Sequence, residues 1–597
     1  MATTVTPSQK QIGGVFLIEE TDPRQVFTPE DFNDQHRLIE QTADEFAQQE
    51  IVPNSARIES KDFGFSRELM KKAAALGLAS VDIPEEYGGA EMDKVTSAIV
   101  ADRLARQGSF AVTFSAHVGI ATLPIVWFGT PEQKKKYLPL LGSGEWIGAY
   151  ALSESSSGSD AMNARTRAVL SADGTHYLLN GEKMWISNAG FADVFIVFAK
   201  VDGEKFTAFI VERTFPGFSV GPEEHKLGIR GSSTCPLILN DCRVPVENVL
   251  GEVGKGATIA FNILNVGRFK LGAACVGGAR ACLSNSIHWA KERKAFGKAI
   301  AEFGMVRELL ADMAIGIYAG EALVYRTAGM IDEAIAAIEN GSPEESKLIR
   351  KAIEEYAVEC SIIKVWTSEM FDKVVDNQVQ IFGGYGFVEE YPAERAYRDS
   401  RVNRIFEGTN EINRLIITGW LLKRATSGQL PLLPAIKKLM DEVMGGPSFG
   451  EEDDRPLASQ RKLLENAKKI GLMVAGTASQ KYMQQITEHQ EVMGAIADIV
   501  IEIFAMDSVL ARTLKLAEGT DRRAAATAVA IGEVYLQEAF ERIEAAAKKA
   551  LADVAEGDML RTQMTILRRL VKSEPFNIIA ARQAIAIRVL EAGKYAL

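Results

Sequence analysis

The sequence predicts an α+β protein in which an N-terminal helical domain is followed by an antiparallel β domain, a helical bundle and an additional helical domain. Two observations predict this order. With 597 residues, 47% of them hydrophobic, the chain is too long for a single core. The hydrophobic period also changes along the chain from that of a helix to that of a strand and back again. We place the four domains at residues 28–145, 146–256, 257–425 and 430–597.

The first two domains differ in their hydrophobic period. In the first, apolar residues recur at helical spacing, as in residues 32–38 and 98–104, and residues 84–89 form a turn. In the second, residues 192–198 and 206–211 are typical of strands. Asp173-Gly174 and Asn180-Gly181 are turn signals between strands, so we expect antiparallel hairpins.

The remainder of the chain returns to the helical period. Breaks at Asn340-Gly341-Ser342-Pro343 and at Gly383-Gly384 divide the third domain. Beyond it, residues 427–434 indicate a linker, residues 445–454 a loop, and residues 524–554 a nearly uninterrupted helix. We expect disorder only in about the first twenty residues, whose composition is polar.

Composition and charge exclude several classes of protein. The formal charge of −12 argues against a nucleic-acid surface, because phosphate binding needs clustered lysines and arginines. The five cysteines have no CxxC spacing and the six histidines no metal-ligand pattern, so we expect neither disulfides nor a metal site. Residues 1–31 lack the features of a secretory signal or transit peptide, and we find no apolar run of about 18 residues that would span a membrane. The expected location is the cytoplasm.

Glu407 is the strongest candidate for a catalytic group. It stands between Phe406 and Gly408, shortly after the run Gly383-Gly384-Tyr385-Gly386. A carboxylate held against apolar neighbours resists ionisation, so its pKa rises toward the range that suits a general base. Most glutamates are solvated surface groups, so this role needs support from other segments.

Three further segments have the composition of a binding site. Residues 150–160 are rich in serine and glycine and leave backbone N–H groups free to meet a polar ligand. Trp185 and Ser187 would share one face of a strand, where they could stack on an aromatic cofactor and hydrogen-bond its edge. In the third segment, the guanidinium groups of Arg268 and Arg293 could bind a phosphate or carboxylate group. Phe296 adds an aromatic ring beside Arg293. Taken singly, each feature has a more common structural explanation, namely a connecting loop, a core tryptophan or a solvated arginine.

In this order and at these separations, the four segments resemble the acyl-CoA dehydrogenase family over residues 27–424. The run from Asn265 to Phe269, the run from Ile405 to Glu411 and the long helical extension are most similar to the very-long-chain branch. The resemblance implies that the middle domain is a β-barrel and that the cofactor is FAD. It also implies that fatty acyl-CoA thioesters are converted to trans-2-enoyl-CoA in fatty acid β-oxidation, with electrons passing to an electron-transfer flavoprotein.

The resemblance assigns roles to individual residues. Glu407 corresponds to the base that removes the α-proton while the β-hydrogen leaves as a hydride, and its backbone N–H corresponds to part of the oxyanion site. Substrate contacts are implied for Ser159, Asn265, Arg268 and Gly408. FAD contacts within one subunit are implied for Tyr150, Leu152, Ser153, Gly158, Ser159, Trp185, Ser187, Thr409 and Glu411. Contacts to the FAD of a neighbouring subunit, which require at least a dimer, are implied for Arg293, Phe296, Gln380, Gly383 and Gly384.

Some points stay open at the level of the sequence. Some relatives carry the base on the helix just before the substrate arginine, but that position is Gly267 here, so only the loop offers a base. An acyl-CoA oxidase would use the same base and pass electrons to oxygen, and a non-catalytic assembly factor could share the fold. The acyl pocket is expected to end around residues 114–122, where Gly119 and Ala121 permit a deep tunnel, but the preferred chain length is not fixed.

The C-terminal extension has two interpretations. Residues 432–444 and 470–474 could supply an apolar face for a membrane, or the extension could cover the catalytic bundle where a second dimer sits in tetrameric relatives. We favour the second interpretation, because the acidic residues 451–454 would be repelled by an anionic bilayer. The expected assembly is therefore a homodimer with acyl-CoA and an electron-transfer flavoprotein as partners, and without nucleic acid.

Overall fold

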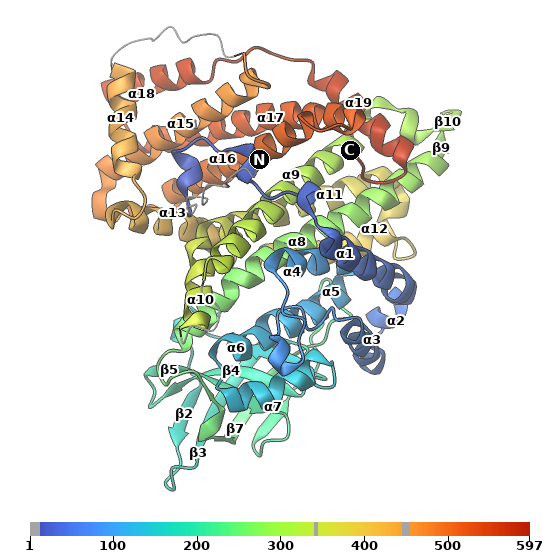
Figure 1. Cartoon of the computed structure of the whole chain (residues 1–597), viewed down its shortest axis with the longest axis vertical. Helices are drawn as coiled ribbons and strands as arrows, with labels where there is room; N and C mark the ends of the chain where they lie inside the picture. The colour runs from blue at the N-terminus through green and yellow to red at the C-terminus, as the bar shows by residue number, and fades with distance from the viewer. Residues whose placement is uncertain (1–11, 339–343, 445–453) are drawn as a thin grey trace, which may run out of the picture.

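The computed structural model describes residues 12–338, 344–444 and 454–597. Three layers are visible in Figure 1: the sheet with α6 and α7 at one end, a bundle of long diagonal helices in the middle, and the additional helices at the other end. The expected order of helical, β and helical parts is confirmed. The expected breaks at residues 340–343 and at most of the loop 445–454 lie outside the described residues.

The N-terminal part is helical because its polar residues cap one short amphipathic helix after another. The Asn33 side chain accepts the His36 N–H at 2.8 Å, and Asp93 accepts the Thr96 N–H at 2.7 Å. Thr130 and Gln133 form a capping box around Pro131. The helices are α1 (Asp34–Phe46), α2 (Ser55–Glu59), α3 (Phe63–Ala75), α4 (Lys94–Leu104), α5 (Gly108–Ser115), α6 (Thr122–Phe128) and α7 (Pro131–Gly142), and a π-turn, η7 (Ala116–Ala121), joins α5 to α6.

The middle domain is an open sheet, so the expected barrel is wrong. Its strand order is β6-β7-β3-β2-β4-β5-β8, and within the described residues the short edge strands β6 and β8 do not pair with each other. It is also mixed, because β4 pairs in parallel with both β1 and β2. The strands are β1 (Gly148–Ala151), β2 (Arg167–Leu170), β3 (His176–Ser187), β4 (Val194–Val201), β5 (Lys205–Glu212), β6 (Phe218–Val220), β7 (Thr234–Pro245) and β8 (Val249–Leu250).

Of the two turn signals in this domain, one is confirmed and one is wrong. Asp173-Gly174 joins β2 to β3 as expected. Asn180-Gly181 instead lies inside β3, where the register with β7 shifts between Leu179 and Gly181. Asparagine and glycine suit such a bulge as well as a turn, since both need an unusual backbone there.

The central bundle is built on α8 (Gly256–Glu292), whose glycines allow close helix packing. A Cβ at Gly277 would lie 1.8 Å from the Asp102 carbonyl oxygen of α4, and one at Gly272 would lie 2.1 Å from Ile363 Cγ2 of α11. A hairpin of β9 (Lys294–Ala295) and β10 (Lys298–Ala299) follows α8. The other elements are α9 (Gly304–Ala336), α10 (Glu345–Glu355), α11 (Ala357–Phe382), η11 (Gly383–Phe387), α12 (Pro392–Ser400), η12 (Arg401–Arg404) and α13 (Asn410–Thr426).

The additional domain lies against the central bundle. Its α16 packs on α9 and α13, and α19 packs on α9. The helices are α14 (Leu432–Met444), α15 (Ala458–Tyr482), α16 (Gln490–Ala517), α17 (Arg522–Val554), α18 (Gly557–Leu570) and α19 (Ile578–Ala592). The expectation of disorder is wrong for residues 12–20, because Phe16 and Leu17 are buried and the Phe16 ring lies 4.8 Å from that of Phe504.

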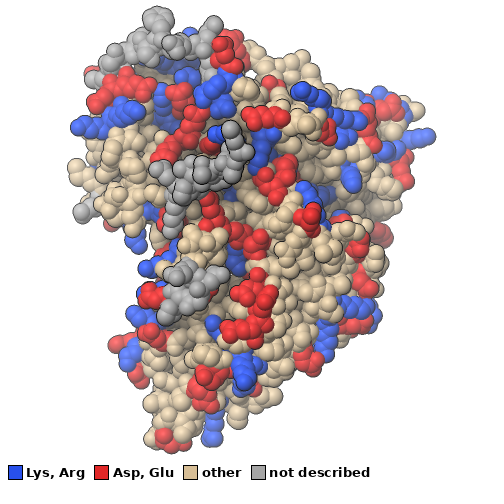
Figure 2. Space-filling model, viewed as in Figure 1, with Lys and Arg blue, Asp and Glu red and all other residues tan. Residues whose placement is uncertain are grey.

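A buried network of charges crosses the boundary between the central bundle and the additional domain. Glu321 on α9 accepts hydrogen bonds from Arg280 of α8 at 2.8 Å, from Arg512 of α16 at 2.7 Å and from Tyr595 at 2.8 Å. Arg280 in turn donates to Asp102 of α4 at 2.9 Å. The network therefore joins three domains through two carboxylates, Glu321 and Asp102. At the surface, by contrast, charges of both signs are interspersed on the face shown in Figure 2.

Two helical stretches, Gly108–Phe128 and Gly256–Glu292, are long and apolar enough to cross a membrane by length and composition. In both, 72% of the most apolar window is buried inside the protein. Their apolar character is thus used in packing α5, α6 and α8 against the rest of the chain.

Candidate active site

A cavity of about 410 Å³ lies between α8, α5 with its π-turn, and α12. Glu407 and Phe406 line it at the point where the loop before α13 meets α8, and Ser187 reaches it from the sheet domain. The volume and lining of this cavity are typical of a small-molecule site, which has a mostly apolar wall and a few polar groups.

The backbone of the Glu407 loop is held in an uncommon conformation. Glu407 has φ of 59° and Gly408 has φ of 81°, so two consecutive residues are left-handed. Such strain in a non-glycine residue persists where the surrounding structure imposes it, and it is common in functional sites. Gly267 lies directly opposite, because a Cβ there would come within 2.6 Å of Glu407 Oε2. The missing side chain at residue 267 therefore makes the room that the carboxylate occupies.

The environment of the Glu407 carboxylate favours its neutral form. The residue is half-buried because it faces the cavity, but its Oε2 is shielded from solvent and has no hydrogen-bond partner among the described residues. Burial raises the pKa of Glu407 to about 7, against the opposing charges of Arg268 and Lys364. A carboxylate with this pKa can accept a proton near neutral pH and release it again.

Side chains from three helices hold the carbonyl groups of this loop. Arg268 Nε of α8 donates to the Glu407 carbonyl at 3.2 Å. Lys364 Nζ of α11 donates to the Gly408 carbonyl and to Asn410 Oδ1, both at 2.7 Å. Asn413 Nδ2 of α13 donates to the carbonyls of Gly408 and Thr409 at 2.9 and 3.0 Å. The Glu407 N–H finds no acceptor among the described residues and is free to meet a ligand oxygen.

The sheet side of the site fits a flat cofactor with a polar edge. Trp185 is 60% exposed with φ of 60°, and it sits in a bulge of β3. Tyr150 is buried, and among the described residues its hydroxyl has no partner. Lys183 Nζ donates to Glu154 Oε1 at 2.7 Å and so fixes the loop that contains Leu152, Ser153, Gly158 and Ser159. An exposed ring and an orphaned hydroxyl are what the flavin of FAD would cover and satisfy.

A second group of expected cofactor residues lies far from Glu407. Along α8, the distance from Gly267 to the end of the helix at Glu292 is about 37 Å. Beyond that end Phe296 is 96% exposed, and the Arg293 guanidinium lies 5.3 Å from the Tyr385 ring centre. Gln380, Gly383 and Gly384 are exposed in the same region. These residues therefore lie together at the end of the bundle remote from the Glu407 loop of the same chain.

The structure places the remaining expected residues as follows. Asn265 is buried and its Oδ1 accepts from Arg268 Nη1 at 3.0 Å, so these two side chains are engaged with the protein. Thr409 caps α13 by accepting the Ile412 N–H, and Glu411 is exposed in the first turn of that helix. Sequence reasoning missed Lys364 and Asn413. The only signal for Lys364 is a single lysine within the apolar run from Ile362 to Trp366.

Family models match four segments that together cover about four-fifths of the chain. They are described as acyl-CoA dehydrogenase N-terminal domain for residues 33–145, middle domain for 149–242 and C-terminal domain for 254–422 and again for 466–569. A protein of Bacillus subtilis described as a probable acyl-CoA dehydrogenase is 49% identical over 98% of both chains.

A crystal structure of an acyl-CoA dehydrogenase complexed with FAD from Bacillus anthracis is 51% identical, with a TM-score of 0.96, and covers 98% of this chain and 100% of that one. The very long-chain specific acyl-CoA dehydrogenase of Macaca fascicularis is 35% identical over 83% of this chain and 77% of its own length. The chain therefore belongs to the acyl-CoA dehydrogenase family and is a flavoprotein oxidoreductase with FAD as its cofactor.

Proposed function

We propose that the protein dehydrogenates fatty acyl-CoA thioesters to trans-2-enoyl-CoA in fatty acid β-oxidation and passes the electrons to an electron-transfer flavoprotein. The observation that carries this proposal is the unpartnered Oε2 of Glu407 at an apolar cavity, opposite Gly267. An α-proton of a thioester is weakly acidic, so its removal needs a base whose pKa lies near the working pH and from which water is excluded.

The residues of the loop account for the proton step. Oε2 of Glu407 is positioned to take the α-proton, because no group of the described residues competes for it. The free Glu407 N–H is a donor for the thioester oxygen as that oxygen gains negative charge, and such a donor contributes about 2.7–4 kcal/mol. FAD, when bound against Trp185 and Tyr150, supplies the acceptor for the hydride that leaves the β-carbon.

A homodimer completes the proposed site. Because Arg293, Phe296, Gln380, Gly383 and Gly384 lie beyond the far end of α8, they support a FAD site shared between two copies. The exposed apolar side chains of Phe296 and Phe387 in this region support the same assembly. The packing of α16 and α19 on the bundle supports the interpretation of the extension as a cover rather than a membrane contact.

The proposed reaction can be tested by anaerobic titration of the FAD-loaded protein with saturated acyl-CoA thioesters. We expect the flavin absorbance to bleach and then to return on addition of an electron-transfer flavoprotein, more quickly than in air alone. Faster return with oxygen than with the flavoprotein would favour an oxidase. Absence of bleaching with every thioester would contradict catalysis and favour an assembly factor.

Lys364→Met should shift the pH profile of the reaction. Burial lowers the pKa of Lys364 to about 8, so the lysine is mostly charged at neutral pH and its charge favours the ionised form of Glu407. Removing this charge and its two hydrogen bonds should move the rising limb of kcat/KM to higher pH and lower kcat by about tenfold to 100-fold. Lys373→Met, on the exposed face of the same helix, is the control. An unchanged pH profile in Lys364→Met would show that the lysine has no influence on the base.

A further inference from the structure

Two facing stripes rich in small residues form much of the wall of the cavity beside Glu407. On α8 the residues that line it follow helical spacing: Gly267, Leu271, Ala274, Gly278, Ala281 and Asn285. On the opposite wall, Gly108, Ala111, Ser115 and Gly119 repeat every three or four residues along α5 and the π-turn. Small side chains on both helices keep the space between them open over several turns.

The length of this space can be estimated from the rise per residue of helix α8. Between Gly267 and Ala281 the helix advances about 21 Å, and up to Asn285 about 27 Å. An extended chain advances about 1.2 Å for each covalent bond. The cavity therefore offers room for a chain of about 17–22 bonds beyond the base. The cavity continues well past Gly119. Gly119 lies in the segment 114–122, where the sequence predicts the end of the acyl pocket.

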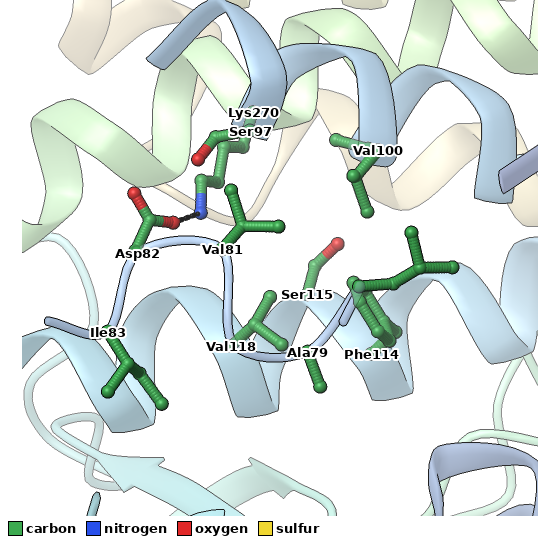
Figure 3. Close-up of a pocket in the computed structure, with 12 residues that line it drawn as sticks. Ala79, Val81, Asp82, Ile83, Ser97, Val100, Phe114, Ser115, Val118 and Lys270 are labelled. Carbon is green, nitrogen blue, oxygen red and sulfur yellow. Dashed lines mark hydrogen bonds and ion pairs between the residues drawn. The ribbon is translucent and has the colours of Figure 1, made fainter. Parts of the chain in front are cut away.

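One charged residue in the wall, Lys270, has its ammonium group turned away from this space. Lys270 follows Gly267 by one turn, and its Nζ donates to Asp82 Oδ2 at 2.6 Å (Figure 3). Asp82 also pairs with Lys94, and all three side chains are buried. Asp82 and Lys270 line a separate small cavity of about 20 Å³. Lys270 therefore presents its methylene stem to the larger cavity, and the wall at this level is apolar.

The end of the cavity remote from Glu407 is polar. Asn285 is exposed there, and Arg395 and Asp399 of α12 line the cavity together with it. An apolar chain that reached these groups would displace their water without offering hydrogen bonds, which is unfavourable. The favourable length therefore ends near this level.

We propose that the preferred substrate is a straight, saturated long-chain acyl-CoA of about 19–24 carbons, because the 17–22 bonds are counted from the α-carbon beside the base, and that its chain lies between α8 and α5. This inference rests on the proposed dehydrogenation. Family membership does not determine chain length, whereas the length and lining of this cavity do.

The inference is tested by measuring kcat/KM and flavin bleaching with saturated acyl-CoAs of increasing length. Burial of one methylene group contributes a factor of about four, so hexadecanoyl-CoA should exceed butyryl-CoA by at least about 100-fold in kcat/KM. A maximum at butyryl-CoA or hexanoyl-CoA would overturn the inference while leaving dehydrogenation intact. Absence of bleaching at all lengths would overturn the proposed reaction, and the inference with it.

Two variants on the same helix locate the chain. Ala274→Phe would block the cavity about 10 Å beyond Gly267, and Ala281→Phe about 21 Å beyond it. In Ala274→Phe, kcat/KM should fall at least about tenfold for dodecanoyl-CoA and longer chains relative to octanoyl-CoA. In Ala281→Phe the same fall should begin only near eicosanoyl-CoA.

Ala336→Phe, on an exposed position of α9, is the matched control and should keep the wild-type length profile. Bound FAD, followed by its absorbance, shows which variants are folded, and leucine replaces phenylalanine at either position where the larger ring prevents folding. Equal effects of the two blocking variants at every chain length would overturn the placement of the chain along α8.

Discussion

Glu407→Gln is expected to bind FAD normally and to lose turnover by about 10²- to 10⁴-fold, the usual contribution of a general base. Glutamine has nearly the same shape, so it keeps the left-handed loop and its contacts with Arg268, Lys364 and Asn413. It cannot accept the α-proton. The loss should appear in the rate of anaerobic flavin reduction and not in the affinity for acyl-CoA.

The melting temperature of Glu407→Gln shows whether lost turnover reflects lost structure. Since the pKa of Glu407 is raised, the folded protein favours the neutral carboxyl group, and that contribution to stability is lost as the pH rises through about 7. Glutamine is neutral at every pH, so at alkaline pH Glu407→Gln should melt at the same temperature as the wild type or higher. Glu68→Gln, at an exposed position of α3, should change neither turnover nor melting. A markedly lower melting temperature in Glu407→Gln would mean that lost turnover reflects lost structure.

Glu321→Gln should be the most destabilising of the conservative substitutions in the charge network. It removes the negative charge that lies between Arg280 and Arg512, both of which are buried. Leaving buried charges without compensation costs about 3–5 kcal/mol. Burial alone would raise the pKa of Glu321, but the two arginines outweigh it and hold the pKa at about 2. A pKa shift of this size corresponds to a contribution of about 3 kcal/mol to folding stability at neutral pH.

The pH dependence of this effect has a definite sign. A depressed carboxylate pKa stabilises the folded state above the pKa of the unfolded chain, and this stabilisation is lost as the pH falls toward about 2. The difference in urea midpoint between wild type and Glu321→Gln should therefore be full at neutral pH and shrink below about pH 4.5. Glu30→Gln is the matched control, because the Glu30 side chain contacts the same Arg512 but is 27% exposed. We expect this variant to lose less than about 1 kcal/mol of folding stability. Equal effects of the two variants would contradict a special role for the buried carboxylate.

The regular parts of the fold could be predicted because they depend on local pattern. Residues 192–198 and 206–211 correspond to β4 and β5, and residues 524–554 to α17, since period and turn residues act over short distances. The open sheet could not be predicted in this way, because closure depends on whether β6 and β8 meet in space. The turn predicted at Asn180-Gly181 is wrong for a related reason, since its pairing partner in β7 lies some sixty residues away.

The candidate site could be predicted in part. Glu407 and Gly267 could be singled out from neighbouring residues, but their direct opposition arises only when the loop packs on α8. Lys364 could not be recognised, because a lysine in a helix is usually solvated, and its role depends on the approach of α11 to the loop carbonyls. The length of the cavity likewise results from the packing of α5 against α8 and not from either segment alone.

The central claim, that Glu407 is the base, is tested most directly by the pH dependence of anaerobic flavin reduction with hexadecanoyl-CoA. In the wild type the rate should rise with pH and level off above an apparent pKa of about 7. In Glu407→Gln the rate should be lower by about 10²-fold or more at every pH, and the rise should disappear. Near-normal reduction in the variant, or a wild-type rate that does not change across this range, would contradict the account.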